Sequence, residues 1–212
     1  TFLPPYAPEH PLDTAKAESW GNVVTQDMFC RHRQALGAAM DDVPAAAPRL
    51  RELVGSMASH SHLAAVQIDQ ATSIDELAHA ARRVDAMVAG LQDGGIRIER
   101  ITRVVGTLNR RLIARAWSMI APAELVANSC LMVMGSEGRS EQIQKTDQDN
   151  ALVLRDGFSM PGLVAVTARL ADALAQLGWP PCPGQIMATN PRWCADVATM
   201  RAHGVHAFLV GE

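Results

Sequence analysis

The pattern of apolar and polar positions divides the chain into a helical first part and a mixed second part. From residue 77 to residue 112, apolar side chains recur mostly at spacings of three and four, the period of an amphipathic helix. Ser73 and Glu76 form a capping box before the first stretch, and the sequence Asp-Gly-Gly at 93–95 separates the two stretches. Two helices joined by such a short turn predict an antiparallel hairpin. The stripes are Leu77, Ala81, Val84, Val88 and Leu91, then Ile98, Ile101, Val105, Leu108 and Leu112.

The rest of the first part, which we take to run from residue 1 to 121, also reads as mainly helical. The proline-rich segment Thr1–Pro11 is expected to be extended, a helix is predicted from Thr25 to Met40, and another starts near Pro48. Three arginines lie outside the stripe of the second hairpin helix, and we predict that they face solvent. They are Arg110, Arg111 and Arg115.

The second part, residues 122–212, alternates strands and helices. A strand is predicted at 131–134, then a Gly-Ser turn, a short helix, and a strand that continues through the apolar residues 151–154. Ser159 is expected to cap a helix with Leu163, Leu170, Leu174 and Leu177 inward. After a proline-rich loop, a third strand is predicted at Gln185–Thr189 and a final helix at Ala195–Phe208. The fold class is therefore α+β: a helical region followed by a small mixed-sheet domain.

The turn and the second strand carry the residues that indicate chemistry. Gly135 has no Cβ, so a phosphate can approach its backbone, and Ser136 stands where free helix N–H groups face an anion. Asp147 and Asp149 are two apart, so on a strand both point to one side, with Cα atoms about 6–7 Å apart. Such a pair can hold Mg²⁺. Alone, an Asp-x-Asp or Gly-Ser is usually a solvated turn, and it is the combination that predicts a nucleotide site.

Composition limits the classes of function. The chain has 212 residues, of which 48% are hydrophobic, enough for one large or two small domains with a real core. A net charge of −3 without a long basic run argues against nucleic acid as a partner. The four cysteines form no Cys-x-x-Cys pair, which speaks against a metal finger or disulfide framework and for the reducing cytoplasm. No apolar run has transmembrane length, and the start at Thr1 suggests part of a longer protein.

Four segments carry a more specific resemblance. Residues 135–142 (Gly-Ser-Glu-Gly-Arg-Ser-Glu-Gln) and 146–151 (Thr-Asp-Gln-Asp-Asn-Ala), with Cys-Pro-Gly at 182–184 and Asn-Pro-Arg-Trp at 190–193, resemble a family of nucleotidyltransferases. This family is similar to the N-terminal catalytic domain of bacterial PII-protein uridylyltransferase, in the DNA polymerase β-like superfamily. The resemblance implies a nucleoside triphosphate substrate with Mg²⁺ or Mn²⁺. By position, Asp147 and Asp149 would be catalytic metal ligands, and Gly135 and Ser136 would contact the phosphates.

Arg139 and Lys145 are predicted phosphate neighbours because their charges would offset that of a triphosphate, with a solvated helix face as the alternative. Glu137 and Glu141 are expected to be exposed caps or partners of Arg139. The superfamily usually adds a third carboxylate as general base, and the predicted third strand at 185–189 carries none. Asp156 and Asp196 are acids whose place the sequence leaves open.

We therefore expect transfer of a nucleoside monophosphate to an acceptor hydroxyl, possibly on a protein, within a larger cytoplasmic signalling protein. The missing acid keeps open an alternative, a catalytically inactive nucleotide-binding regulatory domain. A third interpretation is a structural module in which the helical hairpin forms a homodimer. The sequence indicates neither the preferred base nor the acceptor.

Overall fold

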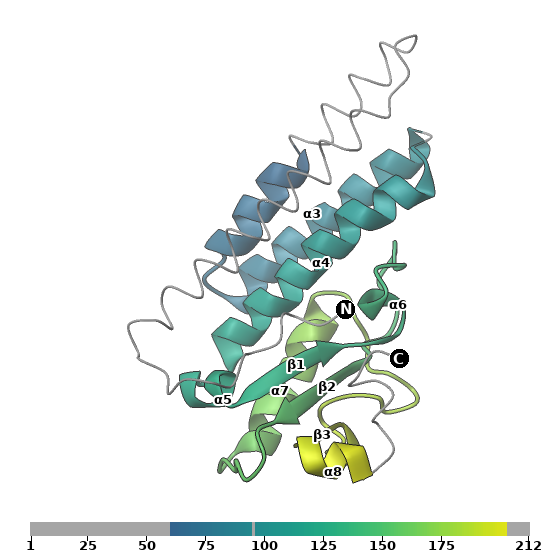
Figure 1. Cartoon of the computed structure of the whole chain (residues 1–212). Coiled ribbons are helices and arrows are strands. Elements are labelled where there is room, and N and C mark those ends of the chain that lie inside the picture. Colours follow the sequence, from purple (N-terminus) through teal and green to yellow (C-terminus); the bar gives the residue numbers. More distant parts are fainter. Residues whose placement is uncertain (1–59, 95, 203–212) are drawn as a thin grey trace.

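The computed structural model describes residues 60–94 and 96–202 (Figure 1). The segments predicted at Thr1–Pro11, at Thr25–Met40 and from Pro48 to residue 59 lie outside these ranges. The described residues form helices and a small three-stranded mixed sheet, so the predicted α+β class is confirmed. None of the described helices combines the length and the apolar character that crossing a bilayer requires.

The predicted helical hairpin is present as α3 (Ile74–Asp93) and α4 (Ile98–Ile120), preceded by helical residues 60–70. The Oγ of Ser73 accepts from the N–H of Glu76 at 3.2 Å, as the capping box predicts. The Glu76 carboxylate, however, accepts from the N–H of Thr72 at 2.7 Å. Every predicted stripe residue is buried except Ile98, which is 56% exposed at the start of α4. Burial of these stripes against each other and against the second part holds the hairpin in place.

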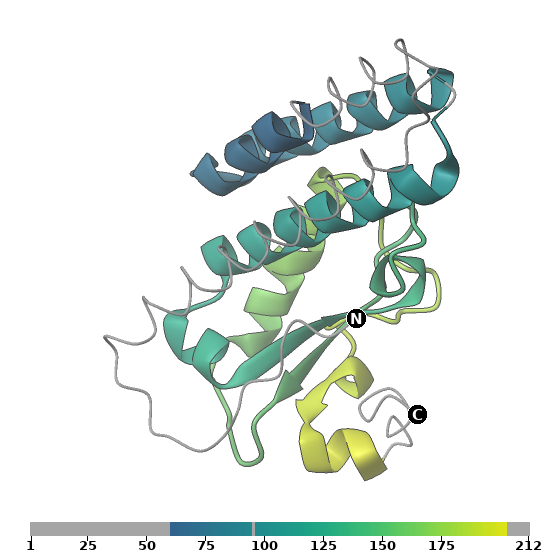
Figure 2. The same cartoon turned by 45° about the horizontal axis from the view of Figure 1, so that its top comes forward.

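The second part contains α5 (Ala123–Ala127), β1 (Ser129–Val133), α6 (Gly135–Gly138), β2 (Asn150–Leu154) and α7 (Leu163–Gln176). A 3₁₀ helix, η1 (Pro191–Trp193), leads into β3 (Cys194–Asp196) and α8 (Val197–Ala202). The strand order is β1-β2-β3, with β1 antiparallel and β3 parallel to β2. Figure 2 shows α7 between α4 and the sheet, and α8 on the sheet's opposite side.

The central strand β2 is buried on both faces, which explains its unbroken apolar sequence. Leu152 and Leu154 pack into the large core shared with α3, α4 and α7. Ala151 and Val153 point the other way and pack with Met200 of α8 in a smaller cluster. The large core contains residues from both sides of position 121. The division into domains at that position stays a prediction.

The predicted third strand is wrong. Residues 185–189 are irregular: Gln185 has a positive φ of 53°, and the N–H of Asn190 donates to the carbonyl of Met187 at 2.9 Å, closing a turn. The sheet's third strand is β3, three residues long, and Asp196 is its last residue. The final helix accordingly starts at Val197 and not at Ala195, and its predicted end at Phe208 lies outside the described residues.

Two further predictions need correction. Helix α7 begins at Leu163 after Gly162, whose φ is +80°, so Ser159 does not cap it. Arg111 does not face solvent: its side chain is 5% exposed and makes two hydrogen bonds to the Asp69 carboxylate, at 3.1 and 2.7 Å. Arg115 donates to the carbonyl of Ala71. The helical residues 60–70 cover this side of α4, which the stripe pattern of α4 alone does not indicate.

Candidate nucleotide and metal site

The site lies where the chain enters β2. Gln148 forms an isolated parallel bridge with Pro181, and its N–H donates to the carbonyl of Pro180 at 2.9 Å. Its side-chain amide is buried and donates to the carbonyls of Ala171 and Trp179, toward α7. Because side chains alternate along an extended segment, Asp147 and Asp149 project to the other side. That is the side of Ala151 and Val153 in β2.

The two aspartates meet a third side chain there. A carboxylate oxygen of Asp147, one of Asp149 and the Sγ of Cys182 all lie within 4.8 Å of one another. Cys182 belongs to the loop that follows α7, and the Gln148–Pro181 bridge brings that loop beside the aspartates. In the sequence, Cys182 is recognisable only as part of the Cys-Pro-Gly motif, which indicates no role for it. Because Cys182 lies far from Asp149 along the chain, no sequence pattern indicates that the two residues are in contact.

The contacts of the Cys182 thiol have opposite effects on its pKa. Its burial raises the pKa of the thiol, and hydrogen bonds from the S–H to the Asp149 and Asp147 carboxylates raise it further. The backbone N–H groups of Ile186 and Gly184 act in the opposite direction, since they favour a negative sulfur. The sulfur therefore lies between two carboxylates and two backbone donors.

Gly135 supports one of these carboxylates directly. Gly135 has a φ of +59°. The N–H of the preceding residue, Met134, donates to the carbonyl of Asp149 at 2.9 Å. A Cβ built on Gly135 would lie 2.2 Å from Asp149 Oδ2. The space that the missing Cβ leaves open is thus filled by the aspartate. The sequence alone predicts that a phosphate uses this space.

The loop between α6 and Asp147 is fixed by Gln142. Its amide nitrogen donates to Thr146 Oγ1 at 2.7 Å and to Ser136 Oγ at 3.3 Å, while its oxygen accepts from Trp179 Nε1 at 2.9 Å. Ser136 is therefore tied to the same loop as the aspartates. Arg139 is exposed on this loop, where its Nε donates to Glu141 Oε2 at 2.8 Å, so the predicted Arg139–Glu141 pairing is confirmed.

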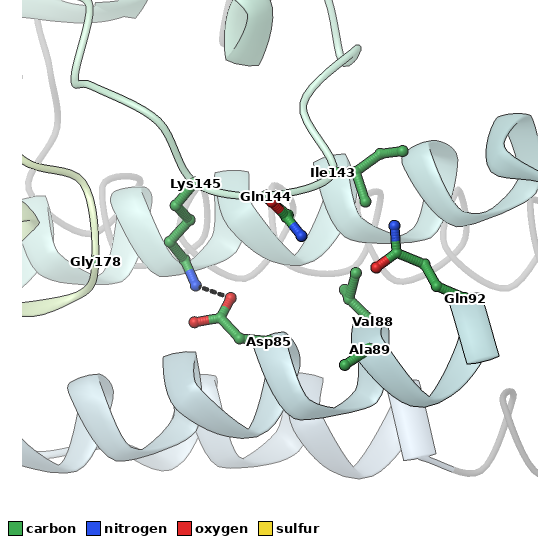
Figure 3. Close-up of a pocket in the computed structure, with 8 residues that line it drawn as sticks. All are labelled: Asp85, Val88, Ala89, Gln92, Ile143, Gln144, Lys145 and Gly178. Carbon is green, nitrogen blue, oxygen red and sulfur yellow. Dashed lines mark hydrogen bonds and ion pairs between the residues drawn. The ribbon is translucent and has the colours of Figure 1, made fainter.

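Lys145 is bound to the helical hairpin (Figure 3). Its ammonium forms an ion pair with Asp85 of α3 and lies 5.0 Å from the centroid of the Trp179 ring. The side chain is only 5% exposed and borders a pocket of about 300 Å³ that also includes Gln92 and Gln144. The ammonium charge is therefore already compensated by a protein group. The predicted role of Lys145 beside a phosphate stays a prediction.

Glu137 is buried, so the expected exposed cap is wrong. The residue is 5% exposed, and its Oε2 accepts from Asn109 Nδ2 of α4 at 2.8 Å. Its Oε1 has no partner and the residue lines a cavity of about 20 Å³, room for one water molecule. Burial raises the pKa of Glu137 to about 7, although the Asn109 hydrogen bond and the charges of Arg110 and Lys145 act against this.

Neither of the two other candidate acids joins the pair. Asp196 is opposite Leu154, five residues beyond Asp149 and so about 16 Å along the strand. Its Oδ1 accepts from the N–H of Thr199, and Asp156 Oδ1 accepts from that of Ala198. Within the part of the chain that the structure describes, the cluster consists of two carboxylates and one thiol.

The comparison with protein families gives this geometry a context. Residues 82–208 match the family described as "Putative nucleotidyltransferase DUF294". The match covers more than half of the chain and includes α4, the sheet and all three members of the cluster. The chain therefore belongs to this nucleotidyltransferase family. The comparisons with curated proteins and with solved structures each returned no match.

Proposed function

We propose that this chain transfers a nucleoside monophosphate from a nucleoside triphosphate to an acceptor hydroxyl and releases pyrophosphate, with a divalent metal ion. The observation that carries the proposal is the convergence of Asp147 and Asp149 beside Gly135, in a member of a nucleotidyltransferase family. A protein hydroxyl as acceptor, as in the uridylyltransferase, belongs to the proposal through the sequence resemblance alone, and so does a place in a larger signalling protein.

The residues present fit a divalent cation. Two carboxylate oxygens and a sulfur within 4.8 Å of one another are all metal-binding atoms, and the sequence resemblance implies Mg²⁺ or Mn²⁺. When bound, such an ion polarises phosphate oxygens and offsets the charge that develops during phosphoryl transfer. Asp147 and Asp149 would hold it.

The surrounding residues would orient the substrate. Gly135 and Ser136 begin the short turn beside Asp149, and the Gln142 amide limits the movement of Ser136 relative to Thr146. Arg139 is exposed on the same loop, where a guanidinium can reach a phosphate from solvent. Lys145 acts on the site by attaching the loop to α3, and a direct phosphate contact would require it to leave Asp85.

One observation favours the alternative of a nucleotide-binding regulatory domain without turnover. In the superfamily that the sequence resembles, a third carboxylate often serves as the general base, and among the described residues the third side chain beside the pair is that of Cys182. Loss of a general base typically costs about 10²–10⁴ in rate, whereas nucleotide binding does not depend on it. Binding without turnover is thus a distinct and testable outcome.

The test is transfer of label from each of four α-labelled ribonucleotides to cell extract or to the chain itself, with Mg²⁺ and with Mn²⁺. Asp147→Asn and Asp149→Asn should each reduce transfer by more than about 100-fold, because each replaces a negatively charged metal ligand with a neutral amide. Asp196→Asn is the matched control at the far end of the sheet and should retain activity. Equal transfer by all variants contradicts the proposal. Calorimetric nucleotide binding without pyrophosphate release favours the regulatory domain.

A further inference from the structure

The Sγ of Cys182 lies beside the two aspartate carboxylates, and the described residues bring no third acid to this cluster. We propose that Cys182 is the third metal ligand, and that the mixed site of Asp147, Asp149 and Cys182 prefers a borderline divalent cation such as Co²⁺ or Zn²⁺ to Mg²⁺. This inference rests on the proposed function for one assignment, the two aspartates as metal ligands.

The spacing of the three ligand atoms suits a single ion. Metal–oxygen and metal–sulfur bonds of about 2.0–2.3 Å place any two ligands of one ion within roughly 4.5 Å of each other. The three atoms already lie within 4.8 Å of one another, so small side-chain rotations bring them onto one centre.

The loop holds the sulfur in place for such a contact. Cys182 is 7% exposed, and its carbonyl accepts from the N–H of Gln185 at 2.9 Å in a tight turn. Pro181 and Pro183 on either side fix φ and so restrict the turn. The backbone N–H groups of Gly184 and Ile186 are hydrogen-bond partners of the sulfur and so fix its position in the loop.

The sulfur changes which ions the site selects. Mg²⁺ demands oxygen ligands in near-octahedral geometry, while thiolate ligands favour softer ions and affinity rises from Mn²⁺ through Co²⁺. The other two described cysteines, Cys130 and Cys194, lie within β1 and β3 and belong to no such cluster. Cys182 is therefore the cysteine of the described chain that can give the metal a sulfur ligand.

Cobalt is a direct probe, because a sulfur–Co²⁺ bond gives a charge-transfer absorption band that oxygen ligands do not give. Titration of the whole chain with Co²⁺ should produce this band. Cys182→Ser should abolish this band and weaken Co²⁺ binding by at least about tenfold, because loss of even an outer-shell partner typically costs about 10–100-fold. Cys194→Ser is the matched control and should keep the band. Absence of the band in the unmodified chain, or its full retention in Cys182→Ser, overturns the inference.

A second measurement uses the unmodified chain, in case Cys182→Ser does not fold. Co²⁺ should slow alkylation of Cys182 by iodoacetamide, as mapped by mass spectrometry, and should leave alkylation of Cys194 unchanged; equal alkylation with and without Co²⁺ overturns the inference. The outcome is independent of turnover. A sulfur–Co²⁺ band without any nucleotidyl transfer refutes only the proposed enzyme, whereas transfer supported by Mg²⁺ without a band refutes only the thiolate ligand.

Discussion

Gly135 and Asp149 are in such close contact that the glycine has no room for a side chain: a Cβ would lie 2.2 Å from Asp149 Oδ2. The turn before α6 and the segment that enters β2 therefore pack directly against each other at these two residues. The position of the Asp149 carboxylate, which we propose binds the metal, therefore depends on the absence of a methyl group at Gly135, fourteen positions earlier in the sequence.

Gly135→Ala should displace Asp149 and weaken Mn²⁺–nucleotide binding by more than about tenfold, since the carboxylate must leave its place beside Asp147. Gly157→Ala is the matched control, because Gly157 also has a positive φ, +77°, and nothing within 4 Å of its Cβ position. Both should lose about 1–2 kcal/mol through backbone strain. Calorimetry and urea unfolding separate the two effects, and unchanged nucleotide affinity in Gly135→Ala contradicts the prediction.

Stability should depend on the ionisation of Glu137, whose pKa is raised from 4.5 to about 7. Below pH 4.5 the carboxyl is protonated in both states. Between pH 4.5 and 7 the unfolded chain loses the proton and the folded chain keeps it, so stability falls as pH rises, by about 3 kcal/mol in total. Above pH 7 the loss is complete.

Glu137→Gln should remove this dependence, so that the variant gains on the unmodified chain between pH 5 and 8. Urea unfolding at pH 5, 6, 7 and 8 measures the difference. Glu141→Gln is the control, because that carboxylate is exposed and paired with Arg139. Parallel pH profiles for Glu137→Gln and the unmodified chain would show that the buried carboxyl does not keep its proton.

Asp69→Ala should destabilise the fold by leaving the Arg111 guanidinium buried without its partner. Removing one member of a buried pair typically costs 3–5 kcal/mol, and we expect about 2–3 here because Asp69 is 39% exposed. Arg97→Ala breaks an exposed pair with Glu99 and should cost less than about 1 kcal/mol. Equal midpoints of urea unfolding for the two variants would refute the structural role of Arg111.

Lys145→Met and Asp85→Asn should be coupled, because the two side chains form one ion pair between the site loop and α3. A double-mutant cycle by urea unfolding should give a coupling of about 1 kcal/mol, reduced by the half-exposed Asp85. If Lys145 positions the loop, both variants weaken nucleotide binding alike. Weaker binding in Lys145→Met alone would instead place the ammonium on the phosphates.

The hairpin and the first two strands could be predicted because their signals are local. Stripes at helical spacing and a capping box fix α3 within a few residues, and the residues around Asp147 carry a pattern of apolar strand and turn. The strand β3 has three residues and no period to detect, and a 3₁₀ helix precedes it. The sequence instead predicts the third strand at 185–189, because that segment contains neighbouring apolar residues.

The two aspartates of the candidate site could be predicted from the sequence, whereas the position of Cys182 beside them could not. Asp147 and Asp149 flank Gln148 on the extended segment that enters β2, so their shared side follows from the alternation of side chains. Cys182 arrives through the Gln148–Pro181 bridge after the whole of α7, and no spacing rule encodes such a contact. The burial of Arg111 and Glu137 has the same cause, since each depends on a partner in a distant helix: Asp69 and Asn109.

The bridge between Gln148 and Pro181 also has a consequence for how the protein matures. The thiol can reach the carboxylates only after α7 has docked and returned the chain to the start of β2. A nascent or partly folded chain would therefore offer the proposed metal only three separate weak ligands, and tight binding of the cation would require that this long-range contact has formed. Uptake of metal would then report that assembly has finished.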